Sequence, residues 1–183
     1  MSDALPRRTT HAGRIVFDTF RSAYDPMLNS WLVFRAQILQ EVLSVPADVA
    51  AADTDERERA RAGRFGVWRI LATNNRELGR GSGLFPTPSE ALATVEALQR
   101  EAMSLVASVV RGSTPMTHGW VLRRDGEAVM TSSRWYESAS EAAAAARAAR
   151  AVLATAAIAT GVNIGTQSGR RLRRAIAPVN QIV

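Results

Sequence analysis

TPSEA at residues 87–91 and SASEA at residues 138–142 are nearly the same five-letter phrase, placed 51 residues apart in a chain of 183. Each phrase has the form of a helix start. A Thr or Ser hydroxyl at the N-cap accepts from the amide three residues later, and a Glu there reaches back to the cap. In the first phrase Thr87 and Glu90 hold these positions, and Pro88 suits the first turn because its missing N–H would be unpaired there anyway. Both phrases therefore predict helix N-termini.

The residues after each cap repeat as well. The apolar series are Ala91, Val95, Leu98, Ala102, Leu105 and Val109 after the first cap, and Ala142, Ala146, Ala149, Leu153 and Ala156 after the second. Steps of four and three are typical of one face of a helix. Adding 51 to the first five positions of one series gives the other, so the pattern predicts two amphipathic helices in register. The second face is mostly alanine, so another element can approach it closely.

A strand–turn–strand pattern precedes each cap. The first strands start near Trp68 and Trp120, and the turns that follow contain Asn74-Asn75 and Asp125-Gly126, which tolerate positive φ. A second short strand comes next in both units. One such unit is too small to cover its own apolar face, so we expect two of them to share a four-stranded antiparallel sheet with both helices on one side.

A Ser-x-x-aromatic motif also precedes each cap, from Ser82 to Phe85 and from Ser133 to Tyr136. Together with the Thr or Ser cap and the alanine-rich helix, it resembles the small bacterial YegP-like family, a domain family of unknown function, over about residues 65–157. The chain lacks the lysine that usually follows the cap and the Asn-Gly pair within the helix. The resemblance implies a pseudo-symmetric ββαββα sheet and no established activity.

The fold class predicted from these patterns is α+β. The expected organisation is an N-terminal extension with an apolar helix at 1–46, a polar linker at 47–64, the duplicated ββα domain at 65–160, and an Arg-rich tail at 161–183. Residues 14–24 fit either a strand or a short helix. Asp25-Pro26 indicates the start of a helix that ends near Pro46, although Trp31 to Phe34 also favour a strand.

Composition narrows the classes of function. The chain has no cysteine, which excludes disulfides, thiolate nucleophiles and Cys-based metal sites. All 23 basic residues are arginine, which indicates a GC-rich, bacterial genome, and four of the six net positive charges fall in residues 161–183. The rest is nearly balanced, so a nucleic-acid surface over the whole domain is disfavoured. No apolar run reaches the roughly 18 residues of a membrane span, and no secretory signal is recognisable, so we expect a cytoplasmic protein.

Candidate catalytic groups have simpler interpretations. His118 has no second histidine at ligand spacing, so no metal site is predicted, and a Ser132–His118–Asp125 arrangement lacks a nucleophile elbow. Capping accounts for Glu90 and the matching Glu141. The glycine-rich run at 79–83 is interpreted as a loop or bulge, since no Lys-Ser/Thr follows as in a phosphate-binding loop. We therefore predict no catalytic, cofactor or metal site and no enzymatic activity.

Two functional hypotheses follow. The first is a non-enzymatic interaction or assembly module that binds a protein partner or a second copy through the duplicated sheet and the apolar N-terminal segment. Its candidate contact residues are Trp31, Phe34, Trp135 and Tyr136. The alternative is a nucleic-acid-associated protein that uses exposed aromatics and the tail arginines Arg170, Arg171, Arg173 and Arg174.

Overall fold

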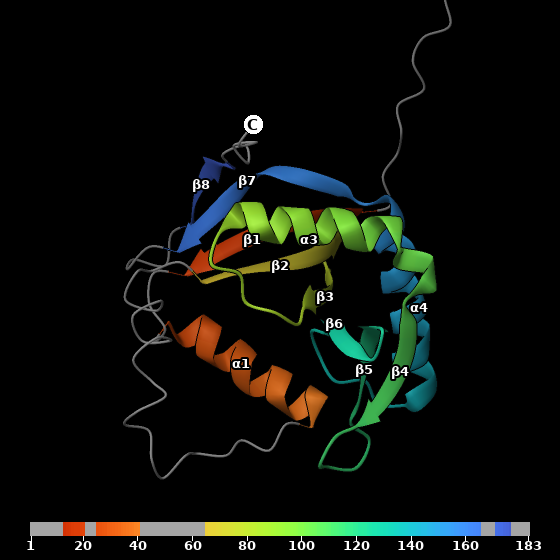
Figure 1. Cartoon of the computed structure of the whole chain (residues 1–183). Coiled ribbons are helices and arrows are strands. Elements are labelled where there is room, and N and C mark those ends of the chain that lie inside the picture. The colour runs from red at the N-terminus through yellow and green to blue at the C-terminus, as the bar shows by residue number, and fades with distance from the viewer. Residues whose placement is uncertain (1–12, 21–24, 41–64, 166–170, 177–183) are drawn as a thin grey trace, which may run out of the picture.

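The computed structural model describes residues 13–20, 25–40, 65–165 and 171–176 (Figure 1). These residues form an eight-stranded mixed sheet in the order β4-β5-β6-β3-β2-β1-β7-β8. The strands are β1 Gly13–Phe20, β2 Phe65–Ala72, β3 Glu77–Gly81, β4 Val106–Arg111, β5 His118–Arg124, β6 Glu127–Ser132, β7 Ala157–Gly165 and β8 Arg171–Ala175. The helices are α1 Pro26–Leu39, α3 Pro88–Arg100, the 3-10 turn η1 Ala102–Ser104, and α4 Ala139–Thr155.

The predicted four-stranded antiparallel sheet with two helices is wrong. Among the described residues the sheet has eight strands and is accompanied by three α-helices. Segments expected outside the repeat belong to the same sheet, because β1 pairs antiparallel with β2 and parallel with β7, and β7 pairs with β8. Without β1, the outer edge of β2 would have no partner for its backbone groups, and without β7 the same would hold for β1. The linker expected at 47–64 lies outside the described residues.

The centre of the sheet contains two hairpins, β2–β3 and β5–β6, which join where β3 and β6 pair antiparallel. Their turns have the positive φ that the sequence indicated: 63° at Asn75, 50° at Asp125 and 87° at Gly126. After each hairpin the aromatic of the Ser-x-x-aromatic motif bridges back to the first strand, Phe85 to Gly66 and Tyr136 to His118.

Helices α3 and α4 cover one face of the sheet and form the main core. The hydroxyl half of each predicted cap is confirmed, since the Thr87 and Ser138 hydroxyls accept from the amides of Glu90 and Glu141, both at 3.2 Å. The expected return bond is different, because the Glu90 carboxylate accepts from the Thr87 hydroxyl at 3.1 Å and not from its amide. The alanine-rich face of α4 is buried, which lets this helix lie close to β4 and β5. The main core consists chiefly of Ile15, Phe17, Trp68, Ile70, Val95, Leu98, Trp120, Leu122, Met130 and Leu153.

Helix α1 packs on the opposite face, against β4, β5 and β6, and Figure 1 shows β2 and β3 running between it and α3. The Asp25 carboxylate caps it by accepting from the amide of Met27 at 2.9 Å. A second core of Phe20, Leu28, Trp31 and Val67 lies on this side. Residues 13–20 are thus a strand, and the apolar segment after Asp25 is a helix that ends at Leu39.

The first repeat helix is shorter than its apolar series predicted. Helix α3 ends at Arg100, and Val109, the last member of the series, lies in strand β4. The segment from Val106 to Val110 is rich in valine, and β-branched residues favour strands over helices. The helical spacing of the apolar series therefore reaches Val109 by coincidence, because that residue belongs to a strand.

The glycine-rich run at 79–83 is divided: its first three residues belong to strand β3, and Ser82 and Gly83 form the bend that follows. The pairing of β3 with β2 is irregular just before the run, between Glu77 and Gly79. A Cβ at Gly79 would lie 2.6 Å from the ring of Trp120 and from the Cε of Met130. A Cβ at Gly81 would overlap the indole of Trp68. These glycines let two buried tryptophans lie directly over the strand.

Candidate functional site

Among the described strands, β4, at one edge of the sheet, is the one with large exposed apolar side chains. The side chain of Val106 is 64% exposed and that of Val109 39% exposed, and the nearby Met103 and Met116 are exposed as well. Arg111 is the one charged residue of this strand. Natural sheet edges usually carry charges, prolines or a covering element, since a bare apolar edge invites pairing with another chain.

The backbone of β4 presents hydrogen-bonding groups to that open edge. Gly112 donates its amide to the carbonyl of Thr117 at 2.8 Å, so these two residues are a hydrogen-bonded pair. Such pairs alternate along antiparallel strands. The register Val109↔Trp120 therefore belongs to the other class, and Ala107, Val109 and Arg111 direct their N–H and C=O groups away from β5.

Side chains occupy both ends of this outward row. The Gln40 amide, just past α1, donates to the carbonyl of Arg111 at 3.4 Å. The Arg150 guanidinium of α4 donates to the carbonyl of Leu105 at 3.0 Å. Between them the N–H and C=O groups of Ala107 and Val109 have no partner among the described residues. We call these four groups the β4 window.

The opposite edge of the sheet differs in composition. Strand β8 pairs with β7 and is the last strand of the sheet in the described part of the chain. Three of its five residues are arginine: Arg171, Arg173 and Arg174. Charged residues on an edge strand oppose sheet-to-sheet association, so the two edges are unequal and β4 is the one suited to pairing.

A charged ladder crosses the sheet face that α1 partly covers. It consists of Asp18, Arg69, Glu77 and Arg80 on β1, β2 and β3. The Arg69 Nε donates to Asp18 at 2.5 Å and its Nη1 to Glu77 at 3.0 Å. Arg80 binds Glu77 through Nε and, at 3.1 Å, through Nη2. Asn163 of β7 donates to the other oxygen of Asp18 at 3.1 Å.

The ladder keeps Arg69 charged despite its burial. Desolvation alone would lower the pKa of Arg69, but the carboxylates of Asp18 and Glu77 outweigh it, so its pKa is raised. Asp18 is only 4% exposed and has both oxygens engaged. Removing either carboxylate would leave a poorly solvated guanidinium.

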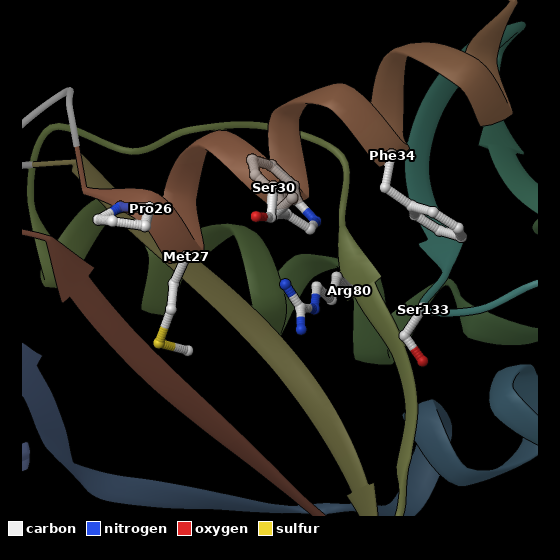
Figure 2. Close-up of a pocket in the computed structure, with 7 residues that line it drawn as sticks. Pro26, Met27, Ser30, Phe34, Arg80 and Ser133 are labelled. Carbon is white, nitrogen blue, oxygen red and sulfur yellow. The ribbon is translucent and has the colours of Figure 1, made fainter. Parts of the chain in front are cut away.

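A cavity of about 370 Å³ lies between α1 and the end of the charged ladder. Figure 2 shows Met27, Ser30 and Phe34 of α1 opposite Arg80 of β3 and Ser133, which follows β6, and Trp31 also lines the cavity. Among the described lining residues Arg80 is the one ionisable side chain. This part of the lining therefore combines apolar side chains of α1 with one cation and two hydroxyls.

The structure separates the aromatic residues predicted as an interaction set. Trp31 is 4% exposed and belongs to the second core. Phe34 and Trp135 contact each other edge to face, with ring centroids 5.4 Å apart. Tyr136 packs against the main core on the other face, under the Arg134 guanidinium at 4.9 Å. Phe34, Trp135 and Trp31 thus lie on the α1 side, and Tyr136 does not join them.

The other sequence candidates lie apart from one another. Arg171, Arg173 and Arg174 are in β8, whereas Arg170 lies outside the described residues. His118 begins β5 and is half-buried. In the described ranges no three His, Cys, Asp or Glu side chains are grouped so as to hold a metal ion. None of the described helices has the length and apolarity to span a bilayer.

Sequence reasoning missed both the β4 window and the charged ladder. The signal for β4 was the stretch Val106-Ala-Ser-Val-Val110, which is strand-like but was absorbed into a helical series. The ladder had no sequence signal, because its members are brought together by pairing between β1, β2 and β3.

Comparison with known proteins adds no relative: no family model, no curated protein and no solved structure matches this chain. The resemblance to the YegP-like family stays a prediction.

Proposed function

We propose that this chain is a non-enzymatic assembly module whose copies join edge to edge through β4. The observation that carries the proposal is the β4 window: four backbone groups that have no partner among the described residues, on an apolar edge strand and bounded at both ends by side chains. Strand addition at an open edge uses such groups for affinity and the neighbouring side chains for specificity.

A two-fold antiparallel pairing of β4 with a second β4 fits the window in one register. With Ala107 opposite Val109 of the other copy, all four window groups on each chain are used and Ser108 faces its own counterpart. The apolar residues then match, since Val106 faces Val110 across the two-fold axis. Moving the two-fold axis by one residue, to Ala107 or to Val109, changes the pairing by two residues. It would set an open residue opposite Leu105 or Arg111, whose carbonyls Arg150 and Gln40 already engage.

Single cysteines test this register, since the natural chain contains none. Ser108→Cys places two thiols at a non-hydrogen-bonded antiparallel pair, where Cα atoms stand about 4.5 Å apart, a separation that disulfides span. Under mild oxidation we expect Ser108→Cys to form a covalent dimer on a non-reducing gel. Ala107→Cys and Val109→Cys are the matched controls and should cross-link much less, because each would need a shifted register.

Light scattering provides the second test. The wild type should have a mass near twice 19.8 kDa and keep it in 1 M NaCl, because strand pairing does not depend on exposed charges. Val109→Lys should be monomeric at concentrations where the wild type is dimeric. A wild type that is monomeric up to about 1 mM, with no cross-linking by any of the three cysteine variants, would contradict the proposal.

Nucleic-acid binding is the second candidate, supported by the three arginines within β8 and the adjacent Arg170. If these four residues contact phosphates, log K should fall with log salt at about −0.9 per contact. Replacing all four by Gln should then abolish an electrophoretic shift and leave the β4-dependent mass unchanged.

A cytoplasmic location is likewise proposed, and fractionation of the native host tests it.

A further inference from the structure

The cavity beneath α1 has a feature that strand assembly leaves unused: a guanidinium with free donors, beside described lining residues that carry no other charge. Arginine has five N–H donors. Glu77 takes the Nε donor and one Nη2 donor of Arg80, and the others have no partner among the described residues. Figure 2 shows the guanidinium reaching beneath α1 on the side of Met27 and Ser30.

The charged ladder explains why Arg80 keeps donors free. Glu77 also accepts from Arg69, and Asp18 is engaged by Arg69 and Asn163. The two carboxylates therefore accept from Arg69, Asn163 and Arg80 together, and only part of their acceptor capacity is left for Arg80. Arg80 is at the end of this row, its side chain is 24% exposed, and it is the member that lines the cavity.

The rest of the lining suits a flat apolar group. Trp31 and Phe34 are successive aromatic residues on one face of α1, and Met27 adds a thioether that adapts to ring edges. Ser30 and Ser133 place hydroxyls beside the guanidinium, where they can accept or donate one further hydrogen bond. The Ser133 hydroxyl makes only a contact at 3.5 Å, to the carbonyl of Glu77, so it can turn to another acceptor.

We infer that this cavity binds a small carboxylic acid that carries an aromatic ring. The carboxylate pairs with the free end of the Arg80 guanidinium, and the ring packs under Trp31 and Phe34. A planar fork of N–H donors matches carboxylate geometry. A volume of about 370 Å³ is at the small end of ligand pockets, which fits one ring with a short acidic arm.

The charge balance favours a monoanion over a phosphate. Arg80 is the single cation among the described residues of the lining, and Glu77 already neutralises part of its charge. A phosphate monoester carries up to two negative charges, and sites for it normally combine several donors or cations. A carboxylate carries a single negative charge and needs one cation.

The test uses the full-length protein and three probes of similar size: phenylacetate, its neutral amide phenylacetamide, and phenyl phosphate. Backbone and indole NMR signals are followed during titration. Phenylacetate should give saturable shifts at Trp31 and Phe34, and phenylacetamide should bind at least 10-fold more weakly. Phenyl phosphate should bind no more tightly than phenylacetate.

Arg80→Gln should reduce the affinity for phenylacetate at least 10-fold and leave that for phenylacetamide unchanged. Arg124→Gln is the matched control: the Arg124 side chain is 41% exposed, its Nη1 lies 3.6 Å from a carboxylate oxygen of Glu101, and Arg124 does not line the cavity. The inference is overturned by any of three results: no saturable shift in the wild type at 10 mM phenylacetate, equal binding of acid and amide, or tighter binding of phenyl phosphate. All three are measured on the wild type, so a poorly folded Arg80→Gln protein does not leave the question open.

Discussion

Among single residues, Asp18 is the one charged residue that is buried in the described part of the chain. Its carboxylate accepts from both Arg69 and Asn163. We expect Asp18→Asn to reduce the free energy of unfolding by about 3 kcal/mol, because it removes the nearest counter-charge of a buried guanidinium. Urea unfolding followed by circular dichroism measures the change.

The matched control is Glu101→Gln. Glu101 pairs with Arg124 at 3.6 Å, but both side chains are more than 40% exposed. Exposed pairs contribute at most about 1 kcal/mol. Equal losses for Asp18→Asn and Glu101→Gln would show that burial of the charged ladder has no energetic consequence.

Gly81 is a second residue whose identity the packing dictates. A Cβ there would collide with the buried indole of Trp68, so Gly81→Ala should cost about 1 to 3 kcal/mol. At Gly83 the same change meets Phe85 only at 3.6 Å, an ordinary contact, and should be within about 0.5 kcal/mol of neutral. Thermal unfolding of both variants tests the contrast, and a neutral Gly81→Ala would refute the close-approach explanation.

At the scale of elements, the helix caps were predictable because they are local. Thr87 and Ser138 each bond an amide three residues along their own helix. Thr87→Ala and Ser138→Ala should each lower stability by about 1 kcal/mol, and the double variant by the sum, because the caps are far apart in sequence and on separate helices. Thr87→Ser retains the hydroxyl and should behave as wild type in chemical denaturation.

The same local reasoning failed at β4. Apolar spacing of four and three continued past Arg100, where the chain leaves the helix, and only the valine-rich composition marked the strand. Periodicity reports which residues face the core, whereas the identity of the element also depends on which neighbours are available. Part of the candidate site could be found from sequence: Trp31, Phe34 and Trp135 do gather on the α1 side, yet Arg80 had no signal.

At the scale of the whole molecule, the sheet is larger than the duplication implied. The hairpins and caps follow from contiguous residues, but the pairing of β1 with β7 joins segments that share no motif. Parallel neighbours need a crossover, here almost the whole chain, and nothing local encodes such a choice of partner. The sequence therefore predicted the central repeat units and not their extension at both sides.

This architecture predicts that residues 65–156 do not fold stably alone. The fragment lacks Ile15 and Phe17 of the main core and leaves the outer edge of β2 unpaired. We expect it to aggregate or to unfold without a cooperative transition, whereas residues 13–183 unfold in one step. A soluble fragment with a sharp calorimetric peak would mean that β1 and β7 are accessory.

The parallel pairing of β1 with β7 also bears on the order of events during translation. Phe20 and Ala157 are separated by 137 positions, so β1 emerges from the ribosome long before β7, its parallel partner, has been made. At about 5 to 20 residues per second, that delay is on the order of ten seconds. During this delay the edge of β1 that later pairs with β7 has no partner strand. A nascent chain without β7 therefore carries an open strand edge of the kind that favours aggregation, and β7 and β8 close that side of the sheet once they are made.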